Sequence, residues 1–252
     1  MKRYLQSELL KTKGSILRKL LILVPIVCIC IAYMFSFLGG DIRLTFLSSM
    51  NHWGLLWMPA LIMLLCGMFH TIEQNDTGYK TIFSFPIDLK RSWIAKNMVI
   101  AAFTFIASIA LGVIFVVLQL ALIHQTSKVV PFYSCFAAIL ISWLVSLWQI
   151  PLCLWLSKRI NVFVLMIIGC AANLELGAGK APSSLWWLDP WTYPLRLQVP
   201  ILHTHPNGLI LKADNILINF NVIPIGIALG LLLFIVLTIL TSVIFANREV
   251  IS

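Results

Sequence analysis

Few side chains in this sequence are arranged as in known catalytic sites. A phosphate-binding P-loop needs spaced glycines followed by Lys and then Ser or Thr, because backbone N–H groups and the hydroxyl hold the phosphates and Mg²⁺. The nearest match contains Gly177, Gly179 and Lys180, but Leu174 stands where the first glycine belongs, and Ala181 replaces the hydroxyl. We therefore expect that this chain does not hydrolyse ATP by itself.

Other catalytic motifs are also missing. The sequence contains no His-Glu-x-x-His, no Gly-x-Ser-x-Gly and no pair of carboxylates within its apolar segments to act as acid and base. His203 and His205 have strand-like spacing, but nothing in the sequence places His52 or Asp214 beside them to hold a metal ion. A membrane-embedded enzyme is disfavoured, and we assign no catalytic residue, metal or cofactor to this chain.

The composition indicates a membrane protein. Of the 252 residues, 60% are hydrophobic and 11% are charged, whereas roughly a quarter of the residues of a soluble domain are charged. The six cysteines lie within apolar segments, so a disulfide framework is not expected. About 20 helical residues cross a bilayer core. We predict one all-α integral membrane domain over residues 1–252, with six transmembrane helices at 20–38, 53–71, 98–122, 132–156, 162–176 and 222–245.

The basic residues predict the orientation, because Lys and Arg beside a transmembrane segment are retained in the cytoplasm. Of the 18 Lys and Arg residues, thirteen lie on the side of the two termini and five on the other side. We predict a plasma-membrane protein with cytoplasmic N- and C-termini. The net charge of +9 does not indicate a nucleic acid partner, since the basic residues flank apolar segments instead of gathering with base-stacking aromatics.

Residues 1–19 have the pattern of an amphipathic helix in the cytoplasmic membrane interface. On a helical wheel Leu5, Leu9 and Ile16 share one face, and basic residues lie away from it. Gly14 weakens the helix. The alternative is a basic tail that only sets the orientation.

One cytoplasmic loop, residues 72–97, is of sizeable length. A group of apolar side chains in this loop would be costly to expose to water if no protein covered it. This favours docking of the group into a groove of a partner protein. Packing of the same group under the membrane face is the alternative. Pro86 disfavours a helix just before it, and Asp88 then caps a helix that runs into the third segment. The apolar group consists of Ile82, Phe83 and Phe85.

Residues 177–221 do not form an ordinary polar loop, because prolines punctuate a run of aromatic residues. Aromatic rings favour the headgroup level, and irregular backbone enters a membrane only where protein or water satisfies it. We predict a segment that lies at the outer interface or partly re-enters the membrane. Its aromatic residues include Trp186, Trp187, Trp191 and Tyr193.

Two glycines in the last apolar segment, Gly226 and Gly230, have the spacing that allows close approach of helices. A dimer that packs through this pair is one option. Glycine is also common in membrane helices generally, so the spacing alone does not decide.

Two parts of the sequence resemble a known family. The N-terminal part contains Ser7-Glu8-Leu-Leu-Lys11, Arg18-Lys19-Leu20 and Pro25; the other part contains Glu73, Thr77-Gly78, Phe85-Pro86, Lys90-Arg91 and Lys96. In this order the residues resemble permease subunits of type-two ATP-binding-cassette exporters. The N-terminal motifs are similar to those of the lantibiotic-immunity permeases in that group.

The resemblance implies how such a permease is driven. The loop between the second and third segments carries a coupling helix that docks on a separate ATPase, where ATP and Mg²⁺ bind. The segment between the fifth and sixth segments holds short outer helices that gate the exit, here within Pro182–Pro200 and its four aromatic residues. The implied coupling residues are Glu73, Lys80, Ile82, Phe83, Phe85 and Pro86, and the implied interfacial residues are Leu5, Glu8, Leu9, Lys11 and Ile16.

Immunity complexes of this kind pair two permease subunits with ATPase copies and remove a bacteriocin peptide from the membrane of a Gram-positive producer. Two alternatives stay open. The same mechanism would serve for a drug, a lipid or another peptide. An accessory membrane protein without a motor would also lack catalytic motifs.

Overall fold

The computed structural model describes residues 1–37, 42–77, 87–122 and 130–247. Within these ranges nearly all regular structure is helical, with one isolated bridge between Thr204 and Ile210, which confirms the predicted all-α fold. The longer helices are α1 (Lys2–Lys11), α2 (Ile16–Phe37), α3 (Ile42–His52), α4 (Met58–Thr77), α6 (Leu89–Ala121), α7 (Phe132–Ser146), α8 (Gln149–Leu156), α9 (Val162–Ala172) and α12 (Val222–Asn247). Two π-helical segments, η1 (Trp53–Trp57) and η3 (Asn173–Ala178), and four short helices, η4 (Trp186–Leu188), η5 (Pro190–Thr192), α10 (Tyr193–Arg196) and α11 (Val199–Leu202), complete the set.

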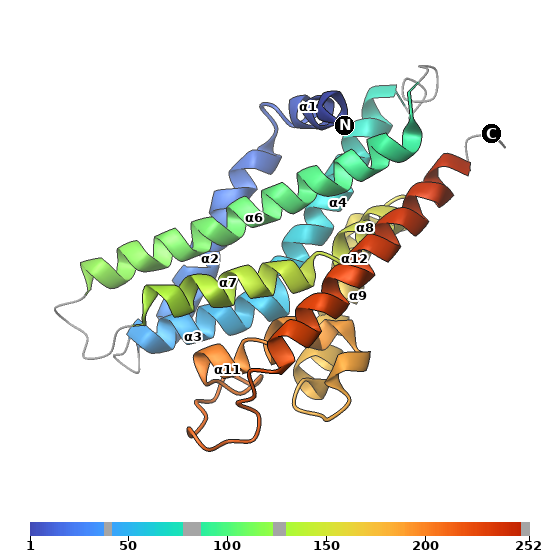
Figure 1. Cartoon of the computed structure of the whole chain (residues 1–252). Helices are drawn as coiled ribbons and strands as arrows, with labels where there is room; N and C mark the ends of the chain where they lie inside the picture. Colours follow the sequence, from blue (N-terminus) through green and yellow to red (C-terminus); the bar gives the residue numbers. More distant parts are fainter. Residues whose placement is uncertain (38–41, 78–86, 123–129, 248–252) are drawn as a thin grey trace.

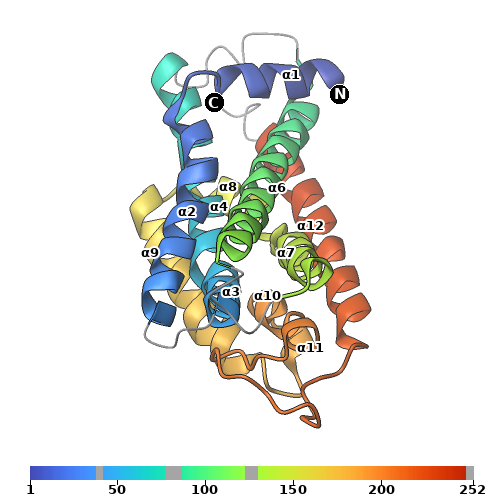
Figure 2. The same ribbon diagram turned by 90° about the vertical axis from the view of Figure 1, so that its left-hand side faces the viewer.

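The long helices run alongside one another to form a bundle (Figure 1). α1 and the last turns of α12 lie at one end of the bundle, and the short helices around α11 lie at the other end. We call the first of these the α1 end. Figure 2 shows α1 lying crosswise over that end.

Four helical stretches are long and apolar enough to cross a membrane, namely Ile16–Met34, Ile42–Asn75, Leu89–Ala121 and Val222–Asn247. A fifth crossing results if α7 and α8, which meet at a 45° bend, form one broken span. The chain is therefore a multi-pass membrane protein. The predicted span at 162–176 corresponds to an apolar helix, Val162–Ala178, that is shorter than these stretches, so the described residues give four or five spans where six were predicted.

The second span begins earlier than predicted. Helix starts at Ile42 instead of residue 53 and continues through η1 into α4. α3 was missed because the hydropathy of this stretch is lowered by polar residues such as Arg43, Thr45 and Ser49. Phe46 and Met50 are nevertheless buried, and the Phe46 ring centroid lies 4.4 Å from that of Phe115 on α6.

The predicted span 132–156 is broken between α7 and α8. Pro151 lies in the first turn of α8. A proline has no N–H to donate and its ring collides with the carbonyl four residues earlier, which here belongs to Leu147, directly at the break. The proline thus accounts for the bend.

The N-terminal helix is shorter than the predicted 1–19. α1 ends at Lys11, a turn follows in which Gly14 has a φ of +79°, and Ile16 already belongs to α2. A positive φ is readily adopted by glycine, so Gly14 breaks the helix instead of merely weakening it. Leu5 packs against the core, whereas Leu9 and Ile16 are exposed.

The Gly226–Gly230 pair packs against other segments of the same chain. A Cβ atom on Gly226 would lie 2.6 Å from Leu197 Cδ1, and one on Gly230 would lie 3.2 Å from Val145 Cα. The two glycines therefore let α12 approach the residue after α10 and the backbone of α7 closely.

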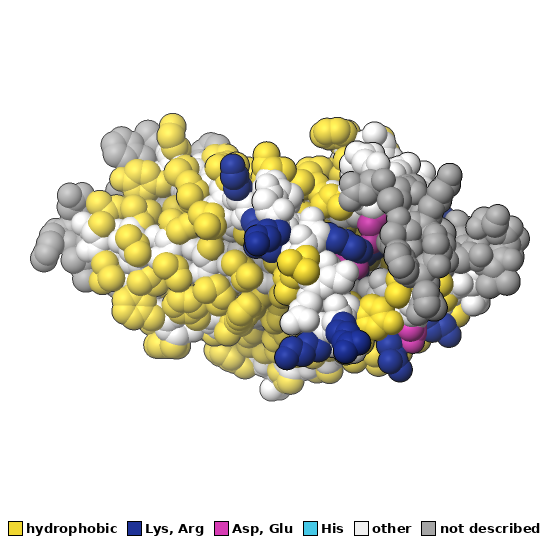
Figure 3. Space-filling model, turned by 90° about the horizontal axis from the view of Figure 1, so that it is seen from above, with side chains coloured by type: hydrophobic (Ala, Val, Ile, Leu, Met, Phe, Trp, Pro, Cys, Tyr) yellow, Lys and Arg dark blue, Asp and Glu magenta, His cyan; other side chains and the backbone are white. Residues whose placement is uncertain are grey.

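Charged side chains gather in one part of the surface. Figure 3 shows Lys, Arg, Asp and Glu in one half of the face on which α1 lies, and a nearly continuous hydrophobic surface over the other half. The exposed hydrophobic side chains of α6 include Ile106, Val113, Val117 and Leu120. An extended exposed apolar surface of this kind is typical of contact with lipid.

Candidate functional site

Four charged side chains meet at the α1 end of the bundle and form what we call the charged cluster, Glu8, Lys11, Glu73 and Lys96. The Lys11 Nζ atom donates to Glu8 Oε1 at 2.7 Å and to Glu73 Oε1 at 3.0 Å. Lys96 Nζ donates to the other carboxylate oxygen of Glu73. Two carboxylates and two ammonium groups from three helices thus form one connected set.

The cluster is largely removed from solvent. Glu8, Glu73 and Lys96 are 2%, 5% and 2% exposed. A buried charge is tolerated only if it is paired and hydrogen-bonded, which the balance of two negative and two positive groups provides. Glu8 Oε2 is the exception, since it is buried without a hydrogen-bond partner among the described residues.

Lys11 is the member of the cluster that retains most contact with solvent. Its partial burial disfavours the charged form, but the neighbouring carboxylates of Glu73 and Glu8 outweigh that effect and raise the pKa of Lys11 above its ordinary value. The ammonium group therefore stays charged at physiological pH.

Local sequence explains where the members of the cluster lie. Glu73 is close to the C-terminal end of α4, and Lys96 is in the second turn of α6. α6 begins where Asp88 caps it, because the Asp88 side chain accepts a hydrogen bond from the Arg91 N–H at 3.0 Å. This confirms the predicted N-cap.

α1 contacts the chain on both sides of the 78–86 segment. On one side Lys11 binds Glu73, and on the other the backbone N–H of Asp88 donates to the Tyr4 hydroxyl at 3.0 Å. Arg18 on α2 also donates to the carbonyl of Leu9 at 2.8 Å, which fixes α1 to the first span. The end of α4, the start of α6 and α1 are therefore joined.

A second set of contacts ties α12 to the same end. The Trp93 ring on α6 stacks on Phe245 with centroids 4.6 Å apart, and its indole N–H donates to Thr241 Oγ1 at 2.9 Å. Lys158, in the turn between α8 and α9, places its Nζ 3.7 Å from the Phe245 ring centroid. A cation at this distance from an aromatic face is attracted by the ring quadrupole.

A family model described as "ABC-2 family transporter protein" matches residues 4–172. The match covers well over half of the chain, from within α1 to the end of α9, and includes the charged cluster. This chain belongs to the ABC-2 transporter family. No curated protein and no solved structure matches it. Permeases of the ABC-2 family are membrane subunits that generally work with a separate ATPase subunit.

Among the predicted coupling residues of this ABC-2 permease, Glu73 belongs to the charged cluster. The other five, Lys80, Ile82, Phe83, Phe85 and Pro86, lie outside the described residues. The sequence interpretation assigned Glu8 and Lys11 to one element and Glu73 to another, and gave no specific partner to Lys96. These residues were not paired from the sequence; the position of Glu73 just after an apolar span is a signal that could have indicated a need for a cation, although not which one.

The four aromatic residues predicted at the far end lie in the part of the ABC-2 permease that follows the family match. Trp186 and Tyr193 are buried with ring centroids 5.9 Å apart, and the Trp191 ring meets Trp148 at 4.7 Å. Trp187 is 46% exposed, and its carbonyl accepts a hydrogen bond from the Tyr193 hydroxyl at 2.7 Å. The predicted short helices are present and pack as a folded unit.

Residues of the P-loop-like stretch of this permease make packing and ion-pair contacts. Gly177 lies in η3, where an added Cβ would meet the Trp191 carbonyl at 2.9 Å, and Lys180 pairs with Asp189 at 3.6 Å. No group of three or more His, Cys, Asp or Glu side chains that would hold a metal ion occurs among the residues searched.

Proposed function

We propose that this ABC-2 permease is driven through residues 73–96 by ATP hydrolysis on a separate subunit, which also binds Mg²⁺. The observation that carries the proposal is the pair of α1 contacts, Lys11 to Glu73 and Tyr4 to Asp88, on the two sides of the 78–86 segment. A motor that docks on this segment would move α4, α6 and α1 together.

The lengths of the helices support transmission of such a movement. α6 contains 33 residues and is therefore about 50 Å long at 1.5 Å per residue, whereas the hydrocarbon core is about 30 Å thick. The charged start of α6 then projects beyond the core. A displacement there is carried along a continuous helix to the far side of the membrane.

We propose six crossings with cytoplasmic N- and C-termini, in which Val162–Ala178 is the short fifth span. The location of α1 and the last turns of α12 at one end, together with the charged side chains there, supports this topology (Figures 1 and 3). α1 lies along the inner leaflet, and its exposed Leu9 and Leu10 face the lipid. A second permease subunit completes the transport path.

We assign gating of the exit to the unit that contains Trp186, Trp187, Trp191 and Tyr193. Trp187 is the member with an exposed ring that is free of the ring contacts made by the others, so its removal perturbs the packing least. Trp187→Ala is expected to lower export at unchanged expression. Full export by this variant would remove the assignment.

The proposed cargo is a lantibiotic or a similar antimicrobial peptide, which the complex expels from the plasma membrane of a Gram-positive bacterium. The similarity of the N-terminal motifs, from Ser7 to Pro25, supports this cargo. The measurement is survival of a sensitive host that expresses the complex, with and without the lantibiotic. If the complex exports a drug, a lipid or a different peptide and does not improve survival of the host in the presence of the lantibiotic, that other compound is the cargo.

The docking of the ATPase is tested with the double variant Phe83→Asp/Phe85→Asp. Two charges on the apolar group should abolish co-purification of the permease with the ATPase, while the permease stays in the membrane fraction. Tyr133→Asp is the matched control, because it makes the same aromatic-to-acid change at an exposed position at the start of α7.

Wild-type recovery of the ATPase with the double variant would overturn the docking assignment. Protection of the host by the permease without any nucleotide-hydrolysing partner would instead support a non-transporting accessory protein.

A further inference from the structure

Buried polar side chains gather where the bundle meets the short helices at the end opposite α1. We call this region the junction; it comprises η1, η3, the start of α8 and the short helices η5, α10 and α11. Figure 2 shows α10 and α11 at that end of the bundle. Six polar atoms at the junction are buried and have no hydrogen-bond partner among the described residues. They are Trp53 Nε1, Trp148 Nε1, both amide atoms of Gln149, Asn173 Oδ1 and Gln198 Nε2.

Contacts between these segments show that the junction is one region. The ring centroids of Trp148 and of Trp191 in η5 are 4.7 Å apart. A Cβ atom on Gly177 in η3 would lie 2.9 Å from the Trp191 carbonyl oxygen, and one on Gly54 in η1 would lie 3.3 Å from Gln198 Nε2. η1 also packs against η3. The five side chains therefore belong to segments that touch one another.

Almost no surface of these five side chains is exposed to solvent. Trp53 and Gln149 are 0% exposed, and the other three are 1% to 4% exposed. A buried polar group without a partner costs more free energy than an ordinary hydrogen bond contributes. Native proteins therefore satisfy nearly all such groups, either with protein atoms or with ordered water. The six atoms thus point to a bound molecule.

The backbone at the junction is irregular in three places. η1 and η3 are π-helical, and α7 and α8 meet at a 45° bend next to Trp148. η1 lies within Ile42–Asn75, and α8 lies within the possible broken span, both of which are apolar enough to cross a membrane. At membrane depth, irregular backbone is tolerated only where protein buries it or where it lines a water-filled space. The backbone and the side chains therefore indicate the same kind of ligand.

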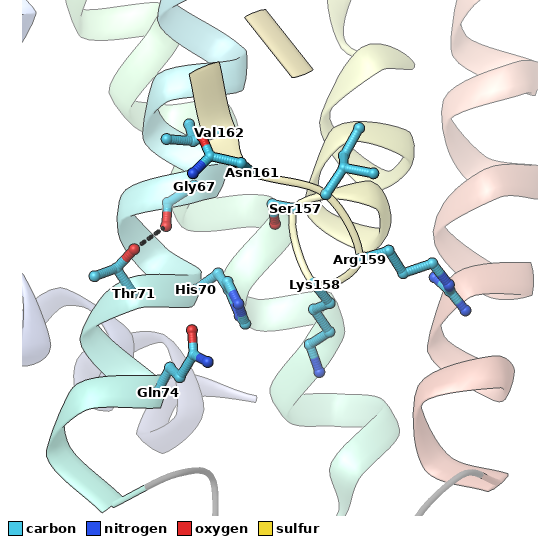
Figure 4. Close-up of a pocket in the computed structure, with 10 residues that line it drawn as sticks. Gly67, His70, Thr71, Gln74, Ser157, Lys158, Arg159, Asn161 and Val162 are labelled. Carbon is cyan, nitrogen blue, oxygen red and sulfur yellow. Dashed lines mark hydrogen bonds between the residues drawn. The ribbon is translucent and has the colours of Figure 1, made fainter. Parts of the chain in front are cut away.

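The cavity at the α1 end differs from the junction, although its lining is also polar. It has a volume of about 290 Å³ and lies between α4 and the turn that joins α8 to α9 (Figure 4). There the Thr71 hydroxyl donates to the Gly67 carbonyl at 2.9 Å, and Ser157 Oγ donates to the Leu154 carbonyl at 2.9 Å. None of its described lining residues has a buried polar side-chain atom without a partner. Unpartnered polar atoms are thus not a feature of every polar region in this chain.

We propose that ordered water molecules occupy the junction and connect its five polar side chains. The site offers both kinds of partner that water needs. N–H groups are available on four of the side chains, and amide oxygens are available on Gln149 and Asn173. Bridging water also lets the short helices shift against the bundle, because it forms new hydrogen bonds as others break. The inference does not rest on the ATPase, on the cargo or on the gating role of Trp187.

Hydroxyl-radical footprinting detects such water. X-rays generate radicals from water bound inside the full-length permease in detergent, and a scavenger removes the radicals that form in the bulk solvent. Mass spectrometry then measures the oxidation rate of each tryptophan. Trp53 and Trp148 are expected to be oxidised several times faster than Trp93. Trp93 is the matched control, because it is 1% exposed but donates its indole N–H to Thr241.

Replacement of one amide tests the same site through stability. Gln149→Met keeps the length of the side chain and removes both polar atoms. The midpoint of thermal unfolding is expected to fall by about 2–4 °C, because the hydrogen bonds to water are lost. Gln74→Met is the matched control, since it makes the same change at an exposed position on α4 (Figure 4) and should leave the midpoint unchanged.

Two results would overturn the water site. One is equal oxidation of Trp53, Trp148 and Trp93. The other is a higher midpoint for Gln149→Met, because removal of a dry, unpartnered amide would stabilise the protein. The footprint of the wild-type protein needs no substitution, so it is decisive even if the variant does not fold. Full export by Trp187→Ala would remove the gating assignment alone and leave this site.

Discussion

Glu73 joins the charged cluster because its two carboxylate oxygens bind lysines from different helices, Lys11 on α1 and Lys96 on α6. Both partners depend on the same negative charge. Removal of that charge would leave two ammonium groups close together in a largely buried space, with Glu8 as the remaining acid. The energetic effect should therefore exceed that of an ordinary surface ion pair.

Glu73→Gln is expected to lower the free energy of unfolding by about 3–5 kcal/mol, the range for a buried pair that loses one partner. Thermal unfolding of the purified permease measures the change. Lys180→Gln is the control, because it removes one member of the more exposed Lys180–Asp189 pair and should cost at most about 1 kcal/mol.

A double substitution tests whether the loss of charge balance in the cluster causes the destabilisation. Glu73→Gln/Lys96→Gln removes one charge of each sign and leaves Lys11 paired with Glu8. The double variant should be more stable than Glu73→Gln alone, since the surplus buried cation is gone. If the two variants unfold at the same temperature, the cluster does not act through its charge balance.

The position of helix α12 depends on two glycines that allow it to pack closely against its neighbours. A Cβ atom on Gly226 would collide with Leu197, and one on Gly230 would make a tight contact with the backbone of Val145. The Trp93–Phe245 stack fixes the other end of the same helix. α12 is thus held at both ends within one chain.

Gly226→Ala should destabilise the permease by about 1–3 kcal/mol, the usual effect of overpacking, because Leu197 is fully buried and has little room to move. Gly179→Ala is the matched control, since nothing lies within 4 Å of its added Cβ and its φ is −68°. Thermal unfolding compares the two. Size-exclusion chromatography should give the same elution for both, whereas loss of a dimer in Gly226→Ala alone would restore the intermolecular interpretation.

At the scale of the whole molecule, the two ends of the bundle differ in chemistry. The α1 end contains the charged cluster and the aromatic stack of α6 and α12. The opposite end contains the folded unit of short helices around Tyr193. The bias of Lys and Arg toward the first end agrees with retention of basic residues in the cytoplasm.

Epitope tags at two positions test this orientation. A tag inserted after residue 80 should be inaccessible to an antibody added to intact cells and accessible after permeabilisation. A tag inserted at Gly208, an exposed turn residue, should be accessible in both conditions. Labelling of the residue 80 tag in intact cells would reverse the topology and separate the 73–96 loop from any cytoplasmic ATPase.

Local sequence was sufficient for several features of this protein. Hydropathy alone identified α2, α4, α6 and α12, because a membrane-crossing helix satisfies its own backbone and needs mainly apolar side chains. Asp88 could be recognised as a cap because capping involves neighbouring residues. The short helices near Tyr193 were implied by the resemblance to type-two exporters, whereas the prolines and aromatic residues themselves predicted only an interfacial or re-entrant segment. The coupling role of Lys80, Ile82, Phe83, Phe85 and Pro86 stays a prediction.

Only the tertiary structure decided which distant residues meet. Lys11 and Glu73 are 62 positions apart and Lys96 is a further 23 from Glu73, so no local pattern pairs them. The tertiary structure also showed that the second span starts at α3 and that Gly226 packs within the same chain. Both features depend on the surface that the helix packs against. Sequence determined that the chain enters a membrane because hydropathy is a sum over single residues. The charged cluster required the fold because ion pairing depends on distances between helices.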